Sequence, residues 1–303
     1  MINPHPGLPE FDYIKFPSLA EASQFLLKHA GEARPFSGGT DCFVRIRDGH
    51  WKEKYLVDIK GLEGTNALSF DPALGLTIGA AVPINRVIAN SEIHKHYPAL
   101  VEAAHSVASY QLRNRASIVG NICNASPAGD TIGACLLYQG VLHVHGPDGP
   151  RQEALADFFK GPGRSALKPG DIVTAISLPT PPLPNAGRYL KVNRNLVGDL
   201  AIVGVTAIGY PDGACPSGYR FLIALASVAP TPLRALPAED ILARMPISEE
   251  IIEEAAQAAM QACSPIDDVR GTARYRKYMV RNMTRQAVTD IWNHLQKAAL
   301  GEA

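Results

Sequence analysis

The chain contains two short polar segments that carry glycine, separated by residues 42–115. The first glycine segment is residues 37–41 (SGGTD), and the second glycine segment is residues 116–130 (ASIVGNICNASPAGD). Glycine lacks a Cβ and tolerates positive φ, so it allows main-chain N–H groups to approach a ligand closely. Serine, threonine and asparagine add hydrogen-bond donors. We therefore expect the two segments to hold an anion such as a diphosphate between them.

Each segment also has an ordinary interpretation. The first is typical of a turn, because paired glycines beside serine and aspartate are common between elements. The second places five polar side chains among small apolar residues, and such side chains need partners when they are buried. A bound dinucleotide would form hydrogen bonds with these side chains, whereas in a solvated loop they would form hydrogen bonds with water. Neither a GxGxxG motif nor a P-loop is present. The residues alone leave both interpretations open.

Composition narrows the class of protein. At 303 residues the chain is longer than one typical domain, so we expect two. Lys plus Arg and Asp plus Glu number 29 each, which predicts no nucleic-acid partner. No apolar run reaches the roughly 18 residues of a membrane span, and residues 1–10 lack a signal-peptide core, so we expect a cytoplasmic protein. The five scattered cysteines predict neither an iron–sulfur cluster nor a metal site.

The hydrophobic periodicity predicts an α+β fold. Ser18 and Glu21 form a capping box for a helix that ends near Gly31. The proline-rich stretch 179–184 is typical of a linker, and we place a domain boundary there. The other expected helices are 91–109 with a break at Pro98, 248–263 and 273–300, and the expected strands are 34–36, 55–59, 76–80, 136–145, 171–178, 189–194, 201–210 and 220–228.

Several motifs occur in a recognisable order. They are SGGTD at 37–41, QLRNRASIVGNICNASPAGD at 111–130, KVNR at 191–194, GDLA at 198–201 and DVRGTARYR at 268–276. In this order they resemble the FAD-binding medium subunit of the molybdenum hydroxylases, the xanthine dehydrogenase and carbon monoxide dehydrogenase family. The resemblance implies a two-part FAD-binding domain of the vanillyl-alcohol-oxidase (PCMH) type at 1–180, with parts at about 1–60 and 61–180. It also implies a smaller C-terminal flavoprotein domain at 186–303, with an antiparallel sheet and helices.

The resemblance also implies residue roles. The diphosphate of a noncovalently held FAD would lie between the two glycine segments. Asp130 matches a carboxylate near the ribose or the ribityl chain, and Val173 matches an apolar contact to the adenine or the ring. Lys191 and Asp199 match a charged pair beside the isoalloxazine, and they are the expected catalytic residues, with Leu200 at the ring face. The expected diphosphate residues are Ser37, Gly38, Gly39, Thr40 and Asp41 on one side, and Ser117, Gly120, Asn121, Asn124 and Ser126 on the other.

Three positions depart from the family pattern. Val119 stands where the family usually has the first glycine of a pair, and Arg115 stands where a small apolar residue is common. A β-branched residue needs negative φ, so we expect the second glycine segment to depart slightly from the common backbone path. Leu200 replaces an aromatic residue, which would leave aliphatic cover on the flavin face.

The function that the resemblance implies is that of an FAD-dependent oxidoreductase subunit in an electron-transfer chain. Electrons would come from 2Fe–2S centres in a small partner subunit, which drains a molybdenum cofactor in a large partner subunit. They would leave to NAD or another acceptor, and the complex would be a dimer of heterotrimers. The positive charge of Lys191 would raise the flavin potential. A free-standing flavin oxidoreductase and a scaffold subunit without flavin remain the alternatives.

Overall fold

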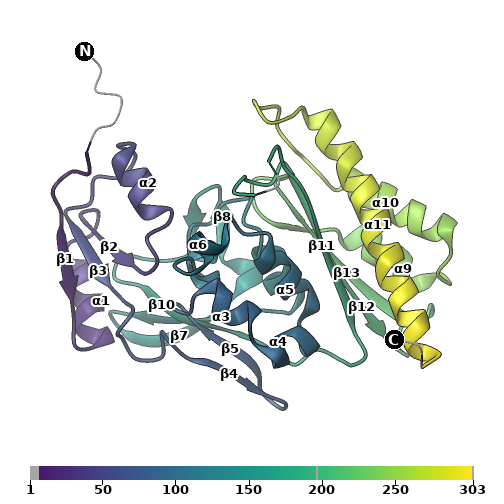
Figure 1. Ribbon diagram of the computed structural model, residues 1–303, viewed down its shortest axis with the longest axis horizontal. Helices are drawn as coiled ribbons and strands as arrows, with labels where there is room; N and C mark the ends of the chain where they lie inside the picture. Colours follow the sequence, from purple (N-terminus) through teal and green to yellow (C-terminus); the bar gives the residue numbers. More distant parts are fainter. Residues whose placement is uncertain (1–6, 196, 302–303) are drawn as a thin grey trace.

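The computed structural model describes residues 7–195 and 197–301, and three larger sheets organise this part of the chain (Figure 1). The first sheet is parallel, with the strand order β1-β3-β2. Ser18 caps its first helix as predicted, because the Oγ atom accepts a hydrogen bond from the N–H of Glu21 at 3.2 Å. The elements are β1 (Asp12–Lys15), α1 (Leu19–Lys28), β2 (Ala33–Phe36), α2 (Cys42–Arg47) and β3 (Tyr55–Asp58).

The second sheet is antiparallel and has the order β4-β5-β10-β6-β7. Short helices pack against it and share one large hydrophobic core with it. The strands are β4 (Leu68–Asp71), β5 (Gly75–Gly79), β6 (Val141–Gly146), β7 (Gly149–Ala154) and β10 (Ile172–Leu178). The helices are α3 (Ile84–Ile88), α4 (Ser91–His96), α5 (Pro98–His105), α6 (Tyr110–Arg113), α7 (Ile118–Cys123) and α8 (Ile132–Leu137), and a 3₁₀ turn η1 (Leu155–Asp157) precedes the hairpin β8 (Phe159–Gly161) and β9 (Arg164–Ser165).

The third sheet is antiparallel in the order β11-β12-β13-β14, and helices cover both of its faces (Figure 1). Side chains alternate between the faces of a strand, so neighbours on β12 enter different cores. Ile208 joins the core of the second sheet beneath α5 and α8, whereas Ala207 joins the core beneath α10 and α11. The elements are β11 (Ala186–Val192), β12 (Val203–Pro211), β13 (Tyr219–Ala226), β14 (Leu233–Arg234), α9 (Leu236–Arg244), α10 (Glu249–Gln261) and α11 (Ala273–Ala299).

The structure confirms the predicted fold class, with parallel and antiparallel sheets followed by an antiparallel sheet and helices. The proposed domain boundaries stay predictions. Those near residue 60 and at 179–184 fall in connections between strands, the first between β3 and β4 and the second between β10 and β11. Among the described residues, no helix has both the length and the apolar character needed to cross a membrane.

The strand predicted over 136–145 is wrong in its first half. Helix α8 continues to Leu137, and strand β6 begins only at Val141. A short apolar run carries no period that separates a buried helix end from a buried strand, which explains the error. The second glycine segment is also more ordered than the loop we expected, because α7 forms within it.

Candidate functional site

The first glycine segment connects β2 to α2 and lies directly against the second. A Cβ atom placed on Gly38 would be 1.9 Å from the carbonyl oxygen of Arg115, so only glycine allows this contact between the two backbones. Gly39 has a φ of 74°, in the left-handed region that glycine favours. Within the described residues, the main-chain N–H groups of residues 38–41 have no hydrogen-bond acceptor. These N–H groups are therefore free to bind a ligand.

The second glycine segment begins with a helix cap. Ser117 is almost fully buried, and its Oγ atom accepts a hydrogen bond from the N–H of Gly120 at 3.0 Å. Val119 is buried within α7, where the helical backbone has the negative φ that a β-branched residue needs. Valine in place of glycine is therefore compatible with the backbone at this position, which forms a regular helical turn.

The remaining polar residues of the second glycine segment form local hydrogen bonds that shape it. The Oδ1 atom of Asn121 accepts a hydrogen bond from the Thr131 hydroxyl at 2.8 Å. The Oγ atom of Ser126 accepts one from the N–H of Ala128 at 3.2 Å. Asn124 is half-buried at the end of α7. Serine and asparagine side chains thus hold the turn between α7 and α8, and the amide of Asn124 stays available.

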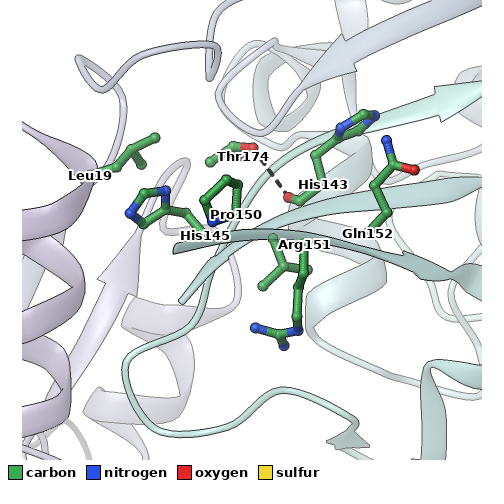
Figure 2. Close-up of a pocket in the computed structure, with 8 residues that line it drawn as sticks. Leu19, His143, His145, Pro150, Arg151, Gln152 and Thr174 are labelled. Carbon is green, nitrogen blue, oxygen red and sulfur yellow. Dashed lines mark hydrogen bonds between the residues drawn. The ribbon is translucent and has the colours of Figure 1, made fainter. Parts of the chain in front are cut away.

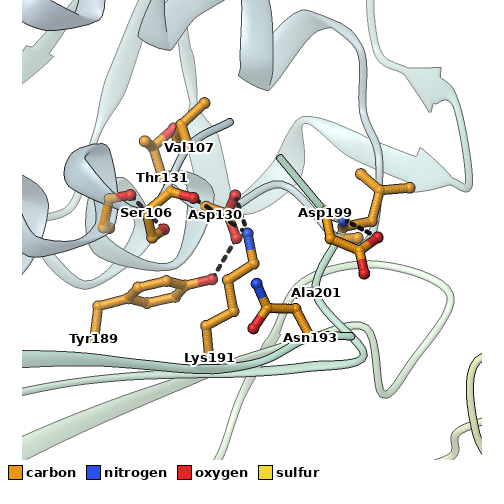
Figure 3. A network of polar contacts seen from close by, with 12 residues as sticks. Ser106, Val107, Asp130, Thr131, Tyr189, Lys191, Asn193, Asp199 and Ala201 are labelled. Carbon is orange, nitrogen blue, oxygen red and sulfur yellow. Dashed lines mark hydrogen bonds and ion pairs between the residues drawn. The ribbon is translucent and has the colours of Figure 1, made fainter. Parts of the chain in front are cut away.

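Asp130 ends the second glycine segment and joins it to the third sheet (Figure 3). One carboxylate oxygen accepts a hydrogen bond from the Tyr189 hydroxyl at 2.6 Å, and the other contacts the Lys191 ammonium at 3.0 Å. Lys191 also donates to the carbonyl of Ser106 at 3.3 Å. Burial raises the pKa of Asp130, and this rise is opposed by the charge of Lys191 and by the hydrogen bonds from Tyr189 and Lys191.

The structure separates Asp199 from Lys191. Asp199 instead accepts hydrogen bonds from the N–H of Arg194 at 3.0 Å and from its guanidinium at 3.4 Å. Figure 3 shows Asp199 to one side of the contact between Lys191 and Asp130. Leu200 is 58% exposed beside it, and Val173 is buried in the core on β10. The ion pair that Lys191 forms is therefore with Asp130, whereas Asp199 pairs with Arg194.

Three residues with alanine or serine side chains adopt positive φ around the same region. They are Ala108 at 45°, Ala125 at 48° and Ser227 at 64°. Ser227 ties the two parts of the chain together, because its N–H donates to the carbonyl of Pro127 and its hydroxyl to the carbonyl of Ala201, each at 2.8 Å. Such backbone strain concentrates at functional sites.

The sequence prediction missed Tyr189, Ser106 and Ser227. Tyr189 had one available signal, because it stands two residues before Lys191 on an expected strand and therefore shares its face. Ser106 contacts Lys191 through its carbonyl and Ser227 contacts Pro127 through its N–H, and the sequence carries no signal for such main-chain contacts.

A separate cavity of about 290 Å³ opens on β6, β7 and β10 (Figure 2). His143, His145, Gln152 and Thr174 line it together with Leu19 of α1 and others. The side chain of His143 contacts the Ser177 hydroxyl at 2.6 Å. None of the residues expected to bind FAD lines this cavity, so it lies apart from the two glycine segments.

The two glycine segments suit the flavin dinucleotide that the resemblance implies. The free N–H groups of the first segment and the contact between the two backbones provide donors for a diphosphate. At the end of the second glycine segment, the Lys191 ammonium and the Asp130 carboxylate form a largely buried ion pair, which provides charge and hydrogen-bonding capacity for a ligand. The donor set therefore fits an elongated anionic cofactor with a polar ring system.

Comparisons with known proteins agree with this geometry. Residues 9–181 match the family model described as the FAD binding domain in molybdopterin dehydrogenase. Residues 188–291 match the model of the CO dehydrogenase flavoprotein C-terminal domain. The chain is 28% identical to the xanthine dehydrogenase FAD-binding subunit of Escherichia coli O157:H7 over 279 residues, covering 92% of this chain and 94% of that protein.

Carbon monoxide dehydrogenase is similar in both sequence and structure. The chain is 28% identical to the medium chain of the Hydrogenophaga pseudoflava enzyme over 284 residues, covering 94% of this chain and 98% of that protein. A solved structure of that enzyme, which lacks the Mo-pyranopterin moiety of its molybdenum cofactor, superposes with a TM-score of 0.89. That match is 28% identical and covers 95% of this chain and 99% of the other. The protein therefore belongs to the family of FAD-binding subunits of the molybdopterin dehydrogenases, which includes those of xanthine dehydrogenase and carbon monoxide dehydrogenase.

Proposed function

We propose that the protein is the electron-transfer subunit of its complex, taking electrons from 2Fe–2S centres of a small partner subunit and passing them to NAD or another acceptor. The observation that carries this proposal is the backbone contact of Gly38 with Arg115 and Ala116, at the start of the second glycine segment, with free N–H groups on residues 38–41 beside it. FAD, when bound, supplies the chemistry that joins one-electron partners to a two-electron acceptor.

We assign the diphosphate of FAD to the two glycine segments. The N–H groups of Gly38, Gly39, Thr40 and Asp41 would donate to one side of it. The exposed main chain at Gly120 and the amides of Asn121 and Asn124 would face the other side. Ser37, Ser117 and Ser126 would act through the backbone, because their hydroxyls already contact main-chain atoms of the protein.

We assign the flavin end of the cofactor to the region around Lys191. The ammonium is held by Asp130 and by the carbonyl of Ser106, so its charge stays in one place. A fixed positive charge beside the ring system favours a more negative state of that ring and raises its reduction potential. Asp199 and Leu200 would border the same end, and Val173 would contact the apolar adenine or ring from the core side.

We also propose that the molybdenum cofactor and the 2Fe–2S clusters belong to a large and a small partner subunit, assembled with this chain as a dimer of heterotrimers. The relative from Hydrogenophaga pseudoflava is named as a medium chain, which supports a multi-subunit assembly. The five cysteines of this chain are free and stand at positions 42, 123, 135, 215 and 263, without the close spacing of a cluster-binding motif, which supports placing the clusters in a partner.

An absorbance spectrum of the intact complex tests the electron path. Anaerobic addition of the reducing substrate should bleach the cluster bands and the flavin band together, and addition of the acceptor should restore both. Clusters that bleach while the flavin band stays oxidised would show that electrons do not pass through this chain. NAD and an artificial dye, added separately, distinguish the natural acceptor class.

A further inference from the structure

The hydroxyl of Tyr189 is buried against the carboxylate of Asp130. Tyr189 is 5% exposed and Asp130 is 8% exposed, and 2.6 Å separates the Tyr189 Oη atom from the Asp130 Oδ1 atom. A Cβ on Gly204 of the neighbouring strand would lie 3.0 Å from the same Oη atom. The phenol is therefore enclosed between β12 and the end of the second glycine segment.

The pleat of β11 places the two donors of Asp130 on one side. Tyr189 and Lys191 stand two residues apart and therefore share a face of the strand. Leu190 between them packs with the opposite core, beneath α10 and α11. Figure 3 shows the Tyr189 hydroxyl and the Lys191 ammonium directed at the same carboxylate. Each oxygen of Asp130 thus receives its own donor.

The charges around this contact show what the Tyr189 hydroxyl contributes to the Asp130 carboxylate. Burial raises the pKa of Asp130, whereas the charge of Lys191 and the hydrogen bonds from Tyr189 and Lys191 lower it. Burial also holds the pKa of Tyr189 well above its usual value of 10, and the charge of Asp130 raises it further. The Tyr189 hydroxyl is therefore the donor in its hydrogen bond to Asp130. Lys191 and Tyr189, both on β11, are the ionisable groups that act on Asp130 among the described residues.

We propose that Tyr189 is a positioning residue, whose hydroxyl binds one oxygen of the buried Asp130 carboxylate and so holds the second oxygen against the Lys191 ammonium at the flavin end of the site. The part that concerns FAD rests on the proposed function. The part that concerns Asp130 is a property of the chain itself and holds without cofactor. A short O–H···O⁻ bond in a buried setting is strong, so its loss leaves one carboxylate oxygen without a partner.

The variant Tyr189→Phe removes the hydroxyl and keeps the ring. Its matched control is Tyr138→Phe, because Tyr138 is also buried and its hydroxyl makes no hydrogen bond to the described residues. Thermal unfolding of both variants and of the wild type, without FAD, is measured at pH 5 and at pH 8. Loss of the hydroxyl raises the pKa of Asp130 further and so penalises the ionised carboxylate more than the protonated one.

The destabilisation of Tyr189→Phe should therefore grow with pH. We expect its midpoint temperature to fall by about 5 °C at pH 8 and by less at pH 5, because acidification favours the protonated carboxyl, which loses less than the ionised form when the hydroxyl is removed. The change caused by Tyr138→Phe should be the same at both pH values. In the background Asp130→Asn the effect of Tyr189→Phe should no longer depend on pH. A penalty that is equal at pH 5 and pH 8, or that keeps its pH dependence in the Asp130→Asn background, would overturn the proposal.

Titration with FAD, followed by flavin fluorescence, tests the link to the site. At pH 8 the dissociation constant of FAD should be about tenfold higher for Tyr189→Phe than for the wild type, and unchanged for Tyr138→Phe. If the wild type binds FAD and Tyr189→Phe binds it equally well at both pH values, Tyr189 does not position this site. If the wild type itself takes up no FAD, the proposed residue assignment fails, and the unfolding series without FAD still decides the role of Tyr189 toward Asp130.

Discussion

Lys191 and Asp130 show how single residues define the flavin end of the site. They stand 61 positions apart in the sequence and meet at 3.0 Å, with Lys191 on β11 and Asp130 at the end of the second glycine segment. Both side chains are largely buried. A buried pair of this kind is stable only as a pair, since removal of one partner leaves an uncompensated charge.

The variant Lys191→Ala should lower the midpoint potential of bound FAD. It removes a positive charge and leaves the Asp130 carboxylate without its ammonium, and both changes disfavour added negative charge on the ring. For a two-electron couple, a loss of about 1.4 kcal/mol corresponds to about 30 mV. Spectroelectrochemistry of the purified subunit measures the shift. Lys52→Ala is the control, because Lys52 is exposed, and an unchanged potential in Lys191→Ala would remove Lys191 from the flavin site.

At the scale of elements, Arg276 anchors helix α11 to the loops of the site. It is the largest fully buried side chain, and its guanidinium donates to the carbonyls of Ile202 and Ser227 at 3.0 and 2.9 Å. It also contacts Asp268 at 2.6 Å. Ser227 in turn donates to the carbonyl of Pro127 in the second glycine segment. A helix of the C-terminal part thus supports the backbone that borders the cofactor site.

The variant Arg276→Met should destabilise the chain strongly. Two carbonyls and the Asp268 carboxylate would lose a buried donor, which costs about 3 kcal/mol in the free energy of unfolding. Arg274→Met on the same helix is the control, because Arg274 is exposed. Denaturant unfolding compares the two, and equal midpoints would contradict the anchoring role of Arg276.

The elements that the sequence predicted well are those with local signals. Ser18 caps helix α1 as expected, because capping is decided by neighbouring residues. Helix α8 and the helical turn of α7 were missed, since a buried run of apolar and small residues has no readable period. The candidate site divides in the same way. The glycine segments were visible as sequence motifs. The pairing of Lys191 with Asp130 depends on how β11 packs against the second glycine segment, which no local pattern in the sequence shows.

The third sheet lies between the two large hydrophobic cores of the molecule, because each of its faces packs into a different core. Tyr189, Ile208 and Leu222 join the core of the second sheet, whereas Val205 and Ile223 join the core beneath α10 and α11. Helix α5 packs on β11, and helix α8 packs on β12 and β13. The larger core therefore crosses the proposed boundary at 179–184.

We expect the chain to unfold as one cooperative unit without FAD, despite its two proposed domains. Exposure of the face of the third sheet that packs on α5 and α8 would open the larger core, so neither part is stable once the other has unfolded. Differential scanning calorimetry should show a single transition whose calorimetric and van't Hoff enthalpies agree. Two separated transitions would show that the two parts fold independently.

The central claim is that the two glycine segments bind the FAD diphosphate between them, and the FAD content of purified Gly38→Ala tests it most directly. A Cβ at Gly38 would lie 1.9 Å from the carbonyl oxygen of Arg115 and must push the segments apart, whereas a Cβ at Gly213 meets no atom within 4 Å, so Gly213→Ala is the matched control. We expect the wild type and Gly213→Ala to carry an equimolar amount of FAD and Gly38→Ala to lose most of it while remaining folded by circular dichroism. A folded Gly38→Ala variant that retains the FAD content of the wild type would contradict the claim.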